Sequence, residues 1–134
     1  MNYWLMKSEP DAYSWDDLVE QGVGTWDGVR NYAARLNMMA MEKGDLAFFY
    51  HSNIGKEIVG IVEIVTEYYP DVTDETGKFV VVQVKARQKL AKPVTLTEIK
   101  SDARFNSMEL IRLSRLSVSK VTKEEFDLIL EYAN

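Results

Sequence analysis

The sequence has no cysteine, one histidine and three prolines among its 134 residues. Without cysteine there are no disulfides, thiolate metal sites or cysteine nucleophiles, which fits a reducing compartment. The longest apolar run, Leu46 to Tyr50, is far too short to cross a bilayer. The start, Met1 to Lys7, lacks the regions of a secretion signal. We therefore expect a cytoplasmic protein, nuclear if eukaryotic, with no membrane partner.

The residues that commonly carry catalysis and metal binding are also scarce. With one histidine and no cysteine, only an all-oxygen metal site is possible. The stretch containing Asp71, Asp74 and Glu75 lacks the ligand spacing and glycine of a calcium loop. No phosphate-binding glycine motif or nucleophile elbow is present, and no spacing pairs His51 with a serine. The sequence thus predicts no metal, no cofactor and no catalytic residue.

The composition is that of an ordinary globular domain. Hydrophobic residues make up 46% of the chain and charged residues 28%. A chain of this length can bury about two-thirds of its extended surface, which is enough for a core without cross-links. There is no repeat, low-complexity stretch or linker. We expect a single domain over residues 1–134, and we expect it to be a monomer.

Charge is divided unevenly along the chain. The formal net charge is −5, and residues 1–84 hold 6 basic against 14 acidic residues. Residues 85–123 instead hold 10 basic and 3 acidic residues, a net charge of +7. A basic segment within an acidic protein can bind phosphate, because the local field governs contact. The alternative is that these charges interleave with acidic ones on the folded surface and cancel.

Hydrophobic periodicity and capping signals predict a mixed α+β domain with a curved or closed antiparallel sheet. Ser14 with Asp17 and Thr122 with Glu125 have the spacing of helix N-terminal capping boxes. The second helix is expected to bury Val29, Tyr32, Leu36 and Met39, after a turn at Trp26–Gly28. The predicted strands are 2–6, 45–51, 57–67, 79–90 and 116–121, and the predicted helices are 15–21, 29–41, 95–100, 110–113 and one starting at 122.

Polar residues interleaved with aromatics follow several of these elements. Lys7-Ser8-Glu9 follows the first strand, the segment Trp26–Asn31 enters the second helix, and Tyr50-His51 ends the next strand. Sites are commonly built where a rigid scaffold holds projecting side chains. Aromatic faces with amide and hydroxyl groups suit a flat, neutral heterocycle. The alternative for Trp26 is a core residue, and for His51 a hydrogen bond at a strand end.

Several strings of the sequence resemble the EVE domain family of the PUA-like superfamily, which is related to the YTH domains. They occur in family order and span nearly the whole chain. They are Tyr3-Trp4-Leu5-Met6-Lys7-Ser8-Glu9-Pro10, Tyr13-Ser14-Trp15-Asp16-Asp17-Leu18, Trp26-Asp27-Gly28-Val29-Arg30-Asn31-Tyr32, Lys43-Gly44-Asp45, Phe49-Tyr50-His51-Ser52, Ile58-Val59-Gly60, Tyr69-Pro70-Asp71 and Ser114-Arg115-Leu116-Ser117-Val118.

The resemblance implies a small mixed β-barrel of about five to six strands flanked by helices. It also implies a non-catalytic module that binds a modified base in DNA or RNA, weakly. Trp26 would form a wall of an aromatic-lined pocket and Asn31 would face the base edge, while Arg30 and Arg115 would meet phosphate. The residues carried over as ligand-binding are Lys7, Ser8, Glu9, Trp26, Val29, Arg30, Asn31, Tyr50, His51, Tyr69, Arg115 and Ser117.

Two other classes of function stay open at this point. An enzyme acting on a modified nucleotide or nucleoside would use His51 as a base, with Glu9 or Asp27 as its partner. A protein-interaction module would use the acidic N-terminal half to bind a basic partner. The sequence distinguishes neither the modification nor DNA from RNA.

Overall fold

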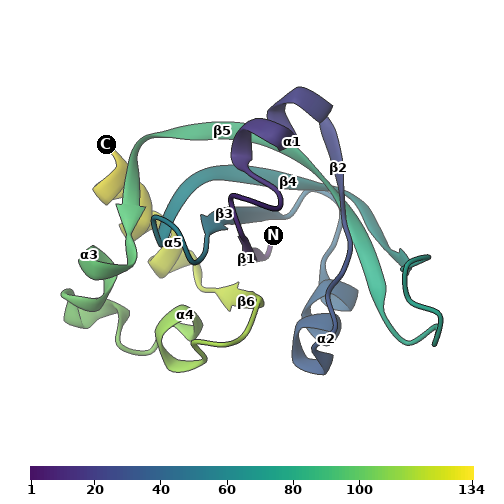
Figure 1. Cartoon of the computed structure of the whole chain (residues 1–134). Coiled ribbons are helices and arrows are strands. Elements are labelled where there is room, and N and C mark those ends of the chain that lie inside the picture. The colour runs from purple at the N-terminus through teal and green to yellow at the C-terminus, as the bar shows by residue number, and fades with distance from the viewer.

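Six strands form one mixed sheet in the computed structural model, which describes all 134 residues (Figure 1). The strand order is β2-β5-β4-β3-β1-β6. Only β1 and β3 are parallel, and every other neighbouring pair is antiparallel. The strands are β1 (Tyr3–Ser8), β2 (Val23–Trp26), β3 (Leu46–His51), β4 (Glu57–Pro70), β5 (Val80–Thr95) and β6 (Val118–Val121).

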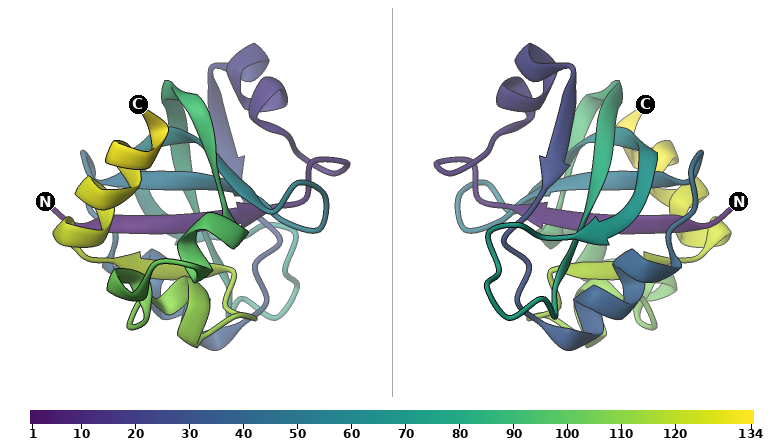
Figure 2. Two further views of the ribbon diagram at one scale, coloured as in Figure 1. Left: turned by 90° about the vertical axis from the view of Figure 1, so that its left-hand side faces the viewer. Right: turned by 90° about the vertical axis from the view of Figure 1, so that its right-hand side faces the viewer.

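Five α-helices and one 3₁₀ turn surround the sheet. None of the helices is long and apolar enough to cross a membrane. In both views of Figure 2 the two termini lie on one side of the molecule and α1 on the other. The helical elements are α1 (Trp15–Gln21), α2 (Tyr32–Ala40), α3 (Leu96–Lys100), η1 (Ala103–Phe105), α4 (Glu109–Arg112) and α5 (Lys123–Ala133).

The sheet is curved but open. The α+β class, the six strands and the flanking helices agree with the fold expected from the sequence, but the predicted barrel closure is wrong. The outer strands β2 and β6 each pair with one neighbour only and not with each other. Register shifts within β4 and β5 bend these two long strands. Bending without a hydrogen-bonded seam between the edges leaves an open sheet.

Both faces of the sheet are buried. Successive residues of β3, Phe48 and Phe49, belong to two different hydrophobic clusters because side chains alternate along a strand. Phe48 packs on Phe126 of α5, with ring centroids 4.7 Å apart. Phe49 contacts Trp15 of α1 and Trp26 of β2 on the opposite face. The capping boxes predicted at the starts of α1 and α5 are both present.

Strand β2 is missing from the sequence prediction, which placed a turn at Trp26. Two glycines among Gly22–Gly24 end α1 and weaken any strand signal. Gly22 caps α1 with a positive φ of 80°. A Cβ on Gly24 would overlap the Tyr13 hydroxyl and Leu18, so the close packing of α1 against β2 needs a glycine there. The strand forms because it pairs with β5, which lies far away in the sequence.

The second helix is shorter than predicted and buries another face. α2 begins at Tyr32, and Val29 lies before it, buried in the core. Tyr32 and Leu36 are 56% and 60% exposed, contrary to the predicted inner face. The helix buries Ala34, Asn37 and Met38 instead. An apolar pattern at helical spacing therefore indicated the helix but not its buried side.

Candidate functional site

Four of the predicted site residues meet in one cavity of about 370 Å³, here called the Trp26 cavity. It lies between the end of β1, the loop before α1 and the end of β2. Its volume is within the range of small-molecule pockets. It is lined by Lys7, Ser8, Glu9, Ala12, Tyr13, Thr25, Trp26 and Asp27.

Two aromatic rings face this cavity at right angles. Trp26 is 7% exposed and belongs to the core, while Tyr13 is half-buried; their ring centroids are 6.1 Å apart and their planes are inclined by 84°. Trp26 also packs edge-on against Phe49 at 5.4 Å. Trp26 is thus both a core residue and a cavity wall. A flat ligand stacked on one of the two rings meets the other edge-on.

Tyr13 lines the Trp26 cavity but is not among the predicted site residues. It stands in the loop before α1, beside the helix cap Ser14. The Ser8 hydroxyl donates to the Tyr13 carbonyl at 2.5 Å, which fixes this loop against the end of β1. Burial, followed by the charges of Asp17 and Asp27, raises the pKa of the Tyr13 hydroxyl. Its position, as an aromatic residue between the end of a strand and a helix cap, was the feature of the sequence that could have identified Tyr13.

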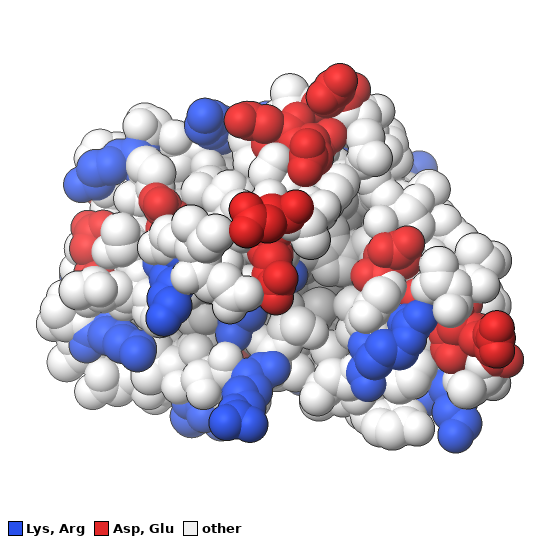
Figure 3. Space-filling model, viewed as in Figure 1, with Lys and Arg blue, Asp and Glu red and all other residues white.

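The charge in the Trp26 cavity is mixed. Glu9 and Asp27 supply carboxylates and Lys7 supplies an ammonium group. Figure 3 shows the face of the molecule that is seen in Figure 1. Acidic side chains lie across its upper middle, and most of its Lys and Arg side chains lie in its lower half. An anion such as phosphate is disfavoured between two carboxylates. The cavity suits a neutral polar ring with both hydrogen-bond donors and acceptors.

Asp71 fixes the segment between Trp26 and α2. Its buried carboxylate accepts hydrogen bonds from the Gly28 N–H at 3.0 Å, from the Thr73 N–H and hydroxyl, and from the Arg30 guanidinium at 3.0 Å. Burial alone would raise the pKa of Asp71, but these hydrogen bonds together lower it far below its usual value. Arg30, expected at phosphate, is thus held by Asp71 and by the Thr73 hydroxyl.

Asn31 is the N-cap of α2. Its side-chain oxygen accepts a hydrogen bond from the Ala34 N–H at 3.0 Å. The predicted helix begins at Val29, which places Asn31 inside it and hides this capping role. Its amide N–H₂ group makes no hydrogen bond to another residue and is the part left for a ligand.

Asn31 and Arg115 share a second, shallower cavity of about 350 Å³, the Arg115 cavity. Arg115 is exposed and forms no ion pair, so its guanidinium is free to bind an anion. The half-exposed Leu113 and Ala33 add apolar surface beside it. The lining residues are Asn31, Ala33, Leu113, Ser114, Arg115 and Leu116.

Tyr50 lies in a third cavity, of about 570 Å³, which contains three lysines and is called the lysine cavity. Tyr50 does not line the Trp26 cavity, although it is one of the predicted ligand-binding residues. Lys7 lines both of these cavities, and Ser114 lines both the lysine and the Arg115 cavities. The lining residues are Lys7, Tyr50, Ser52, Asn53, Lys56, Leu96, Lys100, Leu110, Ile111 and Ser114.

His51 holds the start of α1. Its Nε2 accepts a hydrogen bond from the Trp15 N–H at 3.2 Å, so the lone pair that a general base would use is occupied. Burial lowers the pKa of His51, against the opposing charges of Glu57 and Asp16. The lowered pKa favours the neutral ring at neutral pH, and the hydrogen bond ties the end of β3 to α1.

The remaining predicted site residues lie outside these three cavities. Val29 is in the core, and Tyr69 is half-buried on β4 opposite Val81. Ser117 accepts a hydrogen bond from the Lys7 N–H through its carbonyl. No three His, Asp or Glu side chains lie close enough to hold a metal ion.

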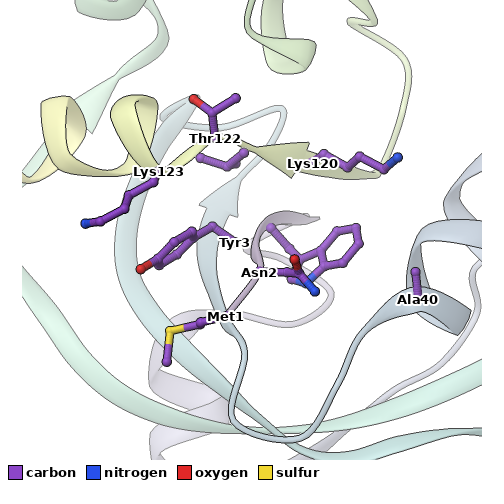
Figure 4. A pocket seen from close by; sticks show the side chains of 9 residues that line it. Met1, Asn2, Tyr3, Ala40, Lys120, Thr122 and Lys123 are labelled. Carbon is purple, nitrogen blue, oxygen red and sulfur yellow. The ribbon is translucent and has the colours of Figure 1, made fainter.

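A cavity of about 770 Å³, larger than these three, contains none of the predicted site residues. It lies between the start of β1, the end of β6 and the start of α5 (Figure 4). Lys120 and Lys123 both line it, but their ammonium groups point in opposite directions. Lys123 is also paired with Asp127 at 3.1 Å. Its cations do not converge on one ligand.

Comparisons with known proteins agree with the resemblance seen in the sequence. Mouse thymocyte nuclear protein 1 is 39% identical to this chain, over 96% of the chain and 72% of the mouse protein. An NMR structure of a Rhodopseudomonas palustris protein has a TM-score of 0.93 and 52% identity, covering 99% of this chain and 93% of that one.

A crystal structure of human thymocyte nuclear protein 1 in complex with DNA containing 5-methylcytosine has a TM-score of 0.93 and 34% identity. The match covers 100% of this chain and 98% of the human one. The EVE domain model matches residues 2–132, nearly the whole length. This chain therefore belongs to the EVE domain family.

Proposed function

We propose that this chain is a non-catalytic module that binds a modified base of nucleic acid in the Trp26 cavity. The observation that carries the proposal is the pair of rings, Trp26 and Tyr13, beside carboxylate, ammonium and hydroxyl groups in one cavity. The complex of human thymocyte nuclear protein 1 with DNA containing 5-methylcytosine supports the proposal and makes that base the first ligand to test.

The polar groups of the cavity complement the edge of cytosine. Cytosine presents an exocyclic amino group, which donates, and Glu9 and Asp27 are acceptors for it. Lys7 and Thr25 are donors for its ring nitrogen and carbonyl. Thymine carries a carbonyl in place of that amino group, and its oxygen would face a carboxylate. We therefore expect cytosine-type bases to bind in preference to thymine.

Weak binding is expected from the energies involved. Extruding a base costs a few kcal/mol, and one aromatic stack returns about 1–3 kcal/mol. The perpendicular rings provide one stack and one edge contact, which roughly balances that cost. Net affinity must then come from phosphate contacts, for which Arg115 is available. Discrimination of one methyl group is worth about 1–3 kcal/mol.

The test compares two tryptophan variants that make the same substitution. Trp26→Phe reduces the ring in the cavity, and Trp15→Phe reduces a buried ring that packs on Phe49 and lines none of the three cavities. Affinity is measured by fluorescence anisotropy for short single strands with one central 5-methylcytosine, cytosine or thymine. Thermal unfolding of each variant is followed in parallel.

Wild-type protein should bind the 5-methylcytosine strand most tightly. Trp26→Phe should reduce the preference for 5-methylcytosine over cytosine. Trp15→Phe should lose a similar amount of stability but keep this preference. Equal affinity of the wild type for all three strands would contradict the proposal. Turnover of a nucleoside that is abolished in His51→Gln would establish an enzyme instead.

A further inference from the structure

The lysine cavity is the only one of the three site cavities with several cations and no carboxylate. Lys7, Lys56 and Lys100 line it, and no Asp or Glu does. None of these lysines takes part in an ion pair. Three unpaired ammonium groups around one concave surface attract an anion. The Trp26 cavity has two carboxylates and suits a neutral ring, whereas the lysine cavity suits an anion.

Lys7 is held at the boundary between these two cavities. Its ammonium group donates to the Ser114 carbonyl at 2.8 Å and lies 5.9 Å from the centre of the Tyr50 ring. Only one of its three donors is used in this way. Burial lowers the pKa of Lys7, so a bound anion would also restore favourable surroundings for its charge. A ligand group in either cavity therefore comes close to Lys7.

Tyr50 adds a neutral hydrogen-bond donor to the lysine cavity. The residue is 3% exposed, but its hydroxyl makes no hydrogen bond to another residue, and burial alone raises its pKa. The hydroxyl is not one of the fully buried unpaired polar atoms, so it reaches the cavity surface and is free to donate to a ligand. The raised pKa keeps the hydroxyl protonated near neutral pH. It is an unused donor in a cavity lined by cations.

Lys56 stands in an uncommon backbone conformation. Its φ is 50°, in the left-handed region that non-glycine residues rarely adopt. Its carbonyl accepts a hydrogen bond from the Leu96 N–H at 2.9 Å, which fixes the turn between β3 and β4 against the start of α3. The position of this lysine at the cavity is thus set by the fold.

We propose that the lysine cavity binds the phosphate of a nucleotide next to the modified base, with Tyr50, Lys56 and Lys100 as its recognition residues. This inference rests on the proposed function, because Lys7 connects the two cavities. The ligand group is a phosphate ester, either a terminal monoester or an internal diester of a strand. With a volume of about 570 Å³, the cavity has room for the attached sugar.

The experiment removes positive charge from the lysine cavity and compares the effect on affinity with that of the same substitutions outside the cavities. The double variant Lys56→Gln/Lys100→Gln and the single variant Tyr50→Phe are tested against Lys43→Gln/Lys78→Gln, whose exposed lysines line none of the three cavities. Ligands are 5-methylcytosine strands with a 5′-phosphate or a 5′-hydroxyl, and strands with one neutral methylphosphonate linkage beside the modified base. Affinity is measured at several salt concentrations.

The cavity double variant should lose about three- to tenfold in affinity, and its log–log salt slope should fall by about 0.7 per lost contact. Its preference for 5-methylcytosine over cytosine should stay unchanged. Tyr50→Phe should lose affinity without a change of slope, because a neutral donor is removed. A methylphosphonate at the contacted linkage should abolish the difference between wild type and variants. Dependence on the 5′-phosphate instead identifies a terminal monoester.

A separate titration does not depend on base recognition. Inorganic phosphate added to wild-type protein should shift the amide NMR signals of Ser52–Lys56 and Lys100 in a saturable way, and not in the cavity double variant. Absence of these shifts, together with equal strand affinities of wild type and cavity variant, would overturn the inference. Retained phosphate shifts without any preference for 5-methylcytosine would overturn the proposed function alone.

Discussion

At the scale of single residues, buried polar groups decide how the site is held. Asp71 joins the loop after β4 to the segment that follows Trp26, through Gly28 and Arg30. His51 joins the end of β3 to the start of α1. Neither residue lines the Trp26 cavity, but each fixes a segment that does. Because folding lowers the pKa of both residues, their protonation is coupled to the stability of the fold.

Asp71→Asn should destabilise the protein by about 1–3 kcal/mol at neutral pH, because the Arg30 charge loses its partner. The pKa of Asp71 is lower in the folded state than its unfolded value of about 3.9. The stability from this carboxylate is therefore present above about pH 4 and is lost as the pH falls further. Denaturant unfolding from pH 7 to pH 2 measures the difference in unfolding free energy between wild type and Asp71→Asn. This difference should narrow below pH 4. A constant difference at all pH values would contradict this role.

His51→Gln should flatten the pH dependence of stability between about pH 7 and pH 5. The folded-state pKa of His51 is lowered below about 6.5, so the unfolded chain binds the proton more readily. Wild-type stability is therefore fully present above the unfolded pKa and falls as the pH drops toward the folded one. Because His51 is the only histidine, denaturant unfolding at both pH values isolates this effect. If stability varied with pH equally in His51→Gln and in the wild type, a contribution from His51 would be excluded.

At the scale of elements, helix ends place the side chains that meet the cavities. Ser14 caps α1 directly after Tyr13, and Asn31 caps α2 beside the Arg115 cavity. The third capping box, at Thr95, starts α3, which carries Lys100 of the lysine cavity. Local capping rules thus locate parts of the site.

Asn31→Asp separates the two roles of this residue. An aspartate caps a helix about as well as an asparagine, so stability should change by less than about 0.5 kcal/mol. The exposed amide donor is replaced by a carboxylate, so affinity for every strand should fall. Asn31→Ala should lose both the cap, about 1 kcal/mol, and the affinity. Thermal unfolding and anisotropy measured on the same samples test this. Unchanged affinity of Asn31→Asp would place Asn31 outside the interface.

At the scale of the whole molecule, charge is arranged by the fold and not by its order along the chain. The basic segment 85–123 contributes Arg115 to the Arg115 cavity and Lys100 to the lysine cavity, but Lys7 and Lys56 of the lysine cavity come from the acidic N-terminal part. Arg87 and Lys123 of the basic segment pair with Glu63 and Asp127, which lie outside it. The alternative of interleaved, cancelling charges thus holds for part of the segment only.

Arg115→Ala should lower affinity for all strands alike and reduce the salt slope by about 0.7, the value of one contact on a single strand. Arg115 forms no ion pair, so stability should stay within about 0.5 kcal/mol of the wild type. Arg87→Ala removes the same charge from a residue paired with Glu63 and serves as the control. A loss of stability with an unchanged salt slope would assign Arg115 to the fold.

The sequence by itself determined the class of fold, five of the six strands, the capping boxes at Ser14 and Thr122, and the family. These depend on periodicity, on local hydrogen bonds and on motifs, all of which are written in neighbouring residues. The motifs also brought Lys7, Ser8, Glu9 and Trp26 forward together, and the structure places these four in one cavity.

Only the tertiary structure decided the rest. Strand β2 exists because β5 pairs with it, the sheet stays open because β2 and β6 do not meet, and α2 buries the face that β6 contacts through Asn37. The partners of Arg30, the lone pair of His51 and the free hydroxyl of Tyr50 likewise depend on residues distant in the chain. Such contacts are set by packing between elements, for which one sequence carries no local signal.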